Sequence, residues 1–115
     1  MWIGSIEFDI LLGDVRSLKQ KRSMVRPLSA ELQRRFSVSA AETGWLDLHR
    51  RAGVGVAVVA ADRAHVVDVL DGAERLVAAR PEIELLSARR DLRRRDDWAR
   101  LNAPRPDPSC AAATA

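Results

Sequence analysis

Residues 2–12 alternate between apolar and polar side chains, and this pattern restricts the start of the chain to one kind of element. Successive side chains of an extended strand point to opposite sides. One face would carry Trp2, Ile6, Phe8, Ile10 and Leu12, and the other Ser5, Glu7 and Asp9. The pattern therefore predicts a β-strand with one buried face and one partly solvent-exposed face.

A helical pattern follows after Gly13 and Asp14. Apolar residues recur in steps of 7, 3, 4 and 4, which predicts a helix from about Gln20 to Phe36 with one buried side. Pro27 falls inside it and lacks the N–H that an interior helical position uses. We expect an irregular first turn with Ser23 capping the regular part, and a bend at Pro27 is the alternative. The buried stripe is Leu18, Val25, Leu28, Leu32 and Phe36.

Two strands and a linker come next. Residues 38–43 predict a short strand, and residues 44–51 a turn or irregular linker. Residues 54–59 form a continuous apolar run, which is typical of a central strand covered on both sides.

A second helix and a last strand complete the pattern. Asp62 is the expected cap of a helix that ends near Arg80, before Pro81, and residues 82–92 predict a strand. The order strand, helix, strand, strand, helix, strand is that of the ferredoxin-like α+β fold. It predicts a two-layer βαββαβ sandwich: a four-stranded antiparallel sheet, with the first and third strands central and two helices on one face. The second helix would face inward with Val66, Leu70, Ala73 and Val77.

The length of 115 residues predicts one domain, residues 1–92, and a C-terminal segment, residues 93–115. That segment predicts a helical turn or two around Trp98 and Leu101, and then a disordered tail. The single cysteine, Cys110, excludes an internal disulfide. Because the chain has neither a signal-peptide pattern nor an apolar run near the ~20 residues that span a bilayer, we expect a cytoplasmic protein.

Basic residues are concentrated in the first helix. Between Arg16 and Arg35, seven Lys or Arg residues face the single acid Glu31, although the net charge of the chain is only +3. Clustered cations on a helix bind phosphates, and such binding depends strongly on salt concentration. The solvent-exposed face of the first strand instead carries carboxylates, which would repel phosphates. The candidate nucleic-acid-binding residues are Lys19, Lys21, Arg22, Arg26, Arg34 and Arg35. The alternative is a solvated face that only aids solubility.

Two other surfaces suggest other functions. Ile3 and Leu11 would leave apolar area on the open face of the sheet, which predicts a homo-oligomer, a dimer in particular. Glu42, Asp47 and His49 lie close together in sequence and suggest an acid–base or metal site. Their spacing matches no known ligand pattern, and the neighbouring Trp45, Leu46 and Leu48 suggest a packed linker instead.

Four stretches of the sequence occur in a distinctive order: 18–22 (LKQKR), 34–42 (RRFSVSAAE), 55–59 (GVAVV) and 62–66 (DRAHV). Together they resemble the YlxP-like family, a small bacterial family of unknown function, from Met1 to about Leu92. The resemblance implies a ferredoxin-like fold. Members are often encoded beside genes for translation initiation and ribosome maturation factors, which implies work on RNA or the ribosome. The resemblance supplies no catalytic residues.

The sequence thus predicts a small non-catalytic protein that binds rRNA or a ribosomal subunit through its first helix. The alternatives are a homo-oligomeric protein-interaction module, and an enzyme of unknown reaction using the region from Glu42 to His49. The sequence predicts no cofactor, metal, membrane or small-molecule substrate.

Overall fold

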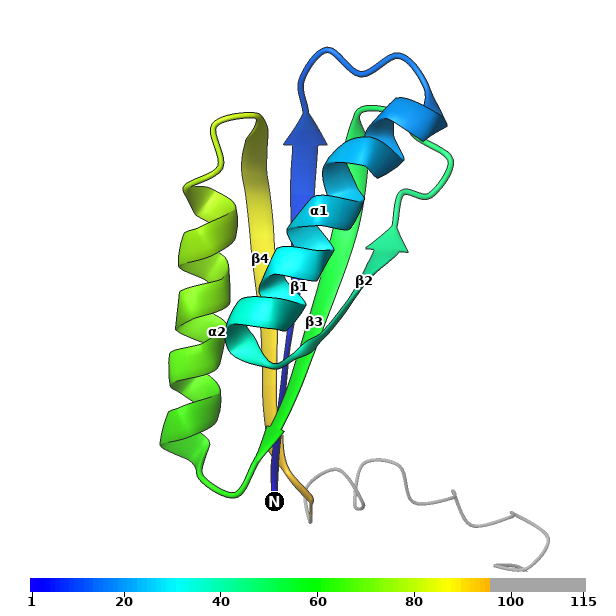
Figure 1. Ribbon diagram of the computed structural model, residues 1–115. Helices are drawn as coiled ribbons and strands as arrows, with labels where there is room; N and C mark the ends of the chain where they lie inside the picture. The colour runs from blue at the N-terminus through cyan, green and yellow to red at the C-terminus, as the bar shows by residue number, and fades with distance from the viewer. Residues whose placement is uncertain (96–115) are drawn as a thin grey trace, which may run out of the picture.

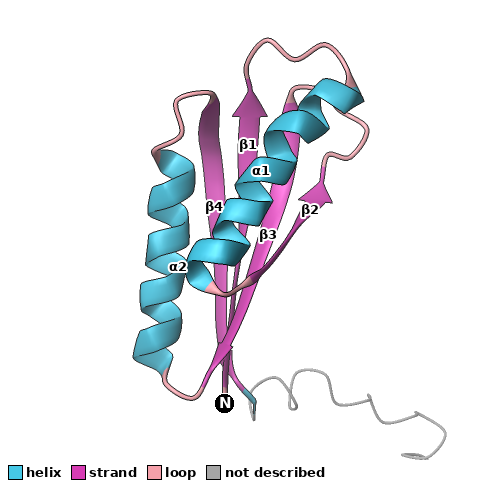
Figure 2. Cartoon of the chain, in the orientation of Figure 1, coloured by secondary structure: helices cyan, strands magenta, loops and turns pink. Residues whose placement is uncertain are grey.

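The computed structural model describes residues 1–95 of the chain. The strands pair antiparallel in the order β2-β3-β1-β4, and both helices cover one face of the sheet (Figures 1 and 2). This confirms the ferredoxin-like α+β sandwich, with the first and third strands in the centre. In chain order the elements are β1 (Trp2–Leu12), α1 (Leu18–Phe36), β2 (Ser39–Gly44), β3 (Arg51–Ala60), α2 (Arg63–Ala78) and β4 (Ile83–Arg94).

The core lies between the sheet and the two helices. The alternation predicted for β1 is confirmed: Ile6, Phe8 and Ile10 are buried, and the residues between them face the open side of the sheet. β3 contributes Val54 and Val56 from the neighbouring strand. Burying each such side chain stabilises the fold by roughly 1.5–3 kcal/mol, so the two central strands fix which face the helices cover.

The start of α1 differs from the prediction. Ser17 is the N-cap, and its side chain accepts a hydrogen bond from the Gln20 backbone N–H at 3.1 Å. Ser23 lies inside the helix, which runs through Pro27 without ending. Pro27 is on the exposed side, where water can bind the Ser23 carbonyl that the missing N–H leaves open. The prediction of Ser23 as the cap was therefore wrong.

α2 follows the prediction closely. Asp62 caps it by accepting a hydrogen bond from the Ala64 N–H, and the four predicted inward residues are buried. Arg90 of β4 ties this helix to the sheet edge through Asp71 at 2.8 Å and Glu74 at 3.1 Å. Burial alone would lower the pKa of Arg90, but hydrogen bonds and charge from these two carboxylates outweigh it and raise that pKa.

The last strand runs two residues beyond the predicted domain end at Leu92, because Arg93 and Arg94 still pair with β1. The helical turn and tail predicted around Trp98 and Leu101 lie outside the described residues. Neither helix in residues 1–95 is long and apolar enough to cross a membrane.

Candidate functional site

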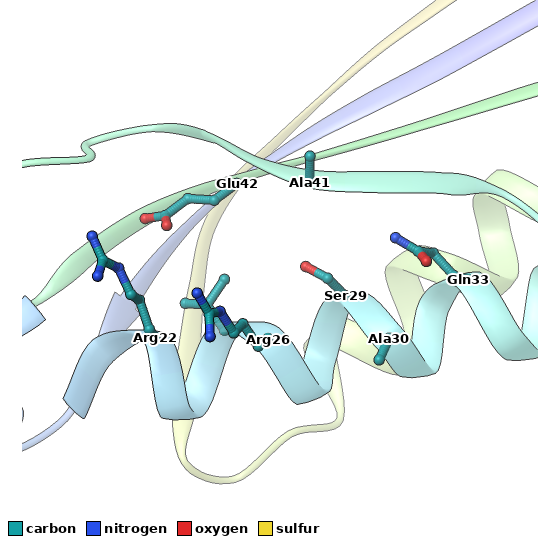
Figure 3. Close-up of a pocket in the computed structure, with 8 residues that line it drawn as sticks. Arg22, Arg26, Ser29, Ala30, Gln33, Ala41 and Glu42 are labelled. Carbon is teal, nitrogen blue, oxygen red and sulfur yellow. The ribbon is translucent and has the colours of Figure 1, made fainter. Parts of the chain in front are cut away.

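A groove runs between α1 and β2, which is an edge strand of the sheet. It encloses about 350 Å³. Figure 3 shows Arg22, Arg26 and Ser29 on the side of α1 that faces β2, with the Glu42 carboxylate extending from β2 toward Arg22. We call this feature the α1–β2 groove. Its lining residues are Arg22, Val25, Arg26, Ser29, Ala30, Gln33, Ala41 and Glu42.

The far end of the α1–β2 groove is closed by a side chain. Gln33 donates a hydrogen bond of 2.8 Å from Nε2 to the Ala40 carbonyl, which points outward from the edge of β2. This bond satisfies one edge carbonyl and fixes α1 against β2.

The structure divides the predicted basic residues by their partners. Arg35 lies 3.6 Å from Glu31, and Arg16 lies 3.6 Å from Asp14, so both are engaged within the chain. The remaining exposed cations have no carboxylate oxygen within 4.0 Å in residues 1–95. We call these four residues the basic strip: Lys19, Arg22, Arg26 and Arg34.

Lys21 was predicted to join this surface, but the structure buries it to 1% exposure. Its Nζ lies 2.8 Å from Glu42 Oε2 and donates hydrogen bonds to the carbonyls of Trp45 at 2.6 Å and Leu48 at 2.8 Å. Two carbonyls and one carboxylate therefore surround the ammonium group inside the protein, so Lys21 is not available to a phosphate. The sequence did contain a signal: Lys21 precedes Val25 by four residues and so continues the buried stripe.

The predicted acid–base group around residue 42 is not assembled. The Glu42 side chain is 21% exposed and paired with Lys21, whereas Asp47 and His49 are exposed in the loop between β2 and β3. Within the described part of the chain, no three potential metal ligands cluster. Because Lys21 neutralises Glu42, the α1–β2 groove keeps the positive charge of its arginines.

The loop between β2 and β3 is exposed, although the sequence suggested packing. Trp45, Leu46 and Leu48 are 46%, 59% and 45% exposed, and we call them the apolar loop. Arg51 stacks on the Trp45 ring at 4.4 Å and forms an ion pair with Asp9. No periodicity marks this exposure, because the loop belongs to neither a helix nor a strand.

Ile3 and Leu11 lie on the open face of β1, as predicted, but at opposite ends of the strand. Ile3 is paired with Val59 and Leu11 with Arg51, both on β3. The face between them carries polar groups, including the 3.1 Å ion pair of Glu7 with Arg89. The two residues therefore do not form one continuous apolar patch.

Comparison with known proteins agrees with this architecture. Residues 3–90 match a family model described as "Protein of unknown function (DUF503)". The chain is also 32% identical over 82 residues to "Uncharacterized protein YlxP" of Bacillus subtilis (strain 168), an alignment that covers 71% of this chain and 89% of that protein. The match confirms the YlxP-like resemblance of the sequence, and the chain belongs to the DUF503 family.

Proposed function

We propose that this protein binds RNA, ribosomal RNA in particular, through the basic strip and the α1–β2 groove, and that it does so in the cytoplasm without catalysing a reaction. The observation that carries the proposal is the absence of carboxylate partners for Lys19, Arg22, Arg26 and Arg34 within residues 1–95. Cations that form no ion pair within the protein are available to bind phosphates.

The geometry of α1 suits a phosphate backbone. Lys19 and Arg26 are seven positions apart, about 10 Å along the helix axis, and Arg22 lies between them. Arg22 and Arg26 reach the same groove as the Ser29 hydroxyl, which can also bond to a phosphate oxygen. The surface thus offers several hydrogen-bond donors along one line, which suits contacts with successive phosphates.

The neutral pair beneath the groove supports the same proposal. An unpaired Glu42 carboxylate beside Arg22 would repel phosphate and reduce the local potential. Lys21 lies 2.8 Å from that carboxylate and cancels its charge from the inside. The attraction of the outward-facing α1 cations for a phosphate is therefore not reduced by an uncompensated Glu42 charge.

Reversing two charges of the basic strip should abolish most of the binding. For Arg22→Glu/Arg26→Glu we expect a loss of at least about ten-fold in affinity for a structured rRNA fragment, and a shallower salt dependence. Two lost phosphate contacts lower the slope of log K against log salt concentration by about 1.4 to 1.8. Filter binding or fluorescence anisotropy over a salt series measures both quantities.

A matched control separates local from global charge. Arg63→Glu/Arg75→Glu makes the same change in net charge on exposed positions of α2. This control should bind almost as tightly as the wild type, and circular dichroism should show that both variants are folded. Equal loss in the two variants, or no RNA binding by the wild-type protein in low salt, would contradict the proposal.

A further inference from the structure

The open face of the sheet contains a hollow made by small side chains. Gly55 and Ala57 of β3 lie beside Ser5 of β1 and Ala41 of β2, and none of these side chains rises far above the sheet. The hollow encloses about 330 Å³. Thr43 lies on its rim and contacts Gly55 so closely that a Cβ there would be 2.8 Å from the threonine methyl. The hollow therefore results from the small residues at these sheet positions.

The Trp45 ring of the apolar loop lies on the same face of the sheet as the hollow. Arg51 belongs to the outward-facing set of β3, since its partner Asp9 faces outward on β1, and Arg51 stacks on Trp45. Trp45 is consequently on the open side of the sheet. From Arg51 to the hollow at residues 55–57 the distance along β3 is about 13–20 Å, at ~3.3 Å per residue.

The apolar loop is held in one conformation. Trp45 has a φ of 57°, in the left-handed region that residues other than glycine rarely adopt. Lys21 fixes both ends of the turn by donating to the carbonyls of Trp45 and Leu48, and Leu48 N–H donates to Trp45 O at 3.1 Å. A large apolar side chain is thus exposed on a fixed support, which lowers the entropy lost on docking.

We propose that a second copy of this chain covers the open face, with Trp45 of each copy seated in the hollow of the other. The two-fold axis would lie between the two sheets, perpendicular to the strands and level with Gly53. It would place the loop end of β3 in one copy over the hollow of the other copy. The same axis brings the end of the sheet that carries Ile3 and Val59 toward the loop end of the other copy. Val59 is 61% exposed and pairs with Ile3, so this end of the sheet also presents apolar area.

The charges of the open face are compatible with this contact. Glu7 is paired with Arg89, Asp9 with Arg51, and Asp91 with Arg93, so most carboxylates of this face are neutralised internally. The exception is Glu84, which lies opposite Leu11 at the end of the sheet. The basic strip lies on α1, on the other side of the sheet, and stays exposed in the dimer. The inference therefore does not depend on RNA binding.

Sedimentation equilibrium of wild-type and variant proteins tests the proposal. We expect a wild-type dimer, and Trp45→Ala should raise its dissociation constant at least about 30-fold, the effect of losing a central aromatic anchor. Ala57→Gln should act similarly by filling the hollow with a polar side chain. The control Ala78→Gln makes the same change at an exposed position of α2 and should leave the dimer intact, as should Arg22→Glu/Arg26→Glu.

Mixing the two disruptive variants tests the reciprocal arrangement. A heterodimer of Trp45→Ala with Ala57→Gln retains one intact contact, because the Ala57→Gln chain still has Trp45 and the other chain still has an open hollow. Energy transfer between labelled variants should show tighter association in the mixture than in either variant alone. A wild-type monomer at all accessible concentrations, a Trp45→Ala dimer as tight as wild type, or no gain on mixing would overturn the proposal.

Discussion

Lys21→Met should lower the free energy of unfolding by about 3 kcal/mol. Breaking a buried ion pair by removing one partner typically costs about 3–5 kcal/mol, because the other charge is left without compensation. We expect the lower end, since the Glu42 side chain is 21% exposed and can be partly hydrated. The carbonyls of Trp45 and Leu48 also lose their donor. For a domain of this size the melting temperature should fall by at least about 10 °C.

Lys19→Met provides the matched control for Lys21→Met. It removes the same ammonium group two residues earlier in α1, from a side chain that is exposed and has no carboxylate partner in residues 1–95. Its effect on stability should stay within about 0.5 kcal/mol. Glu42→Gln keeps both carbonyl hydrogen bonds of Lys21 but removes the opposite charge from an ammonium that is 1% exposed, so it should also cost about 3 kcal/mol. Urea unfolding measures all three variants, and equal values for the two methionine variants would show that Lys21 is not buried.

Gly4→Ala should destabilise the protein by about 1–3 kcal/mol, the usual cost of forcing extra volume into a packed core. A Cβ at Gly4 would lie 2.3 Å from Val66 Cγ1 and 3.2 Å from Leu70 Cδ1. Both side chains are fully buried on α2, so neither can move aside without shifting the helix from β1. Thermal unfolding followed by circular dichroism would show a lower melting temperature.

Gly72→Ala makes the same substitution where a neighbour can adjust. Its Cβ would meet the Phe36 ring edge at 2.6 Å, but that ring is only partly buried and can turn. Alanine also stabilises a helix interior relative to glycine by up to about 1 kcal/mol. We expect Gly72→Ala to be close to neutral. Val66→Ala should partly rescue Gly4→Ala in a double-mutant cycle, and independent, additive effects would count against the close contact.

The spacing of apolar residues predicted the fold, because a strand or helix that buries one face needs apolar side chains at the period of that element. The period of two in residues 2–12 and the 3.6-residue steps of both helices correctly identified most of the buried core. Pro27 misled the prediction of the helix start, because the cost of proline depends on where the freed carbonyl lies. On the exposed side of α1 water can bind the Ser23 carbonyl, so the helix can begin at Leu18.

The candidate site was only partly predictable. Composition located the basic segment, but it could not show which cations had internal partners, because those partners are distant in sequence. Glu42 lies 21 residues after Lys21, and only the packing of β2 against α1 brings them together. The exposure of Trp45 was missed for a related reason: its position depends on Lys21 and Arg51, not on a local pattern.

Both edge strands of the sheet lie beside arginines, and this has a consequence for aggregation. An exposed edge strand can act as a template for pairing with another chain, which leads to fibrils. On one edge, Gln33 occupies the Ala40 carbonyl and Arg22 and Arg26 flank β2. The other edge, β4, carries Arg89, Arg90, Arg93 and Arg94. Lateral growth of the sheet is therefore disfavoured on both sides, whereas the two-fold dimer that we propose on the open face would be complete with two chains.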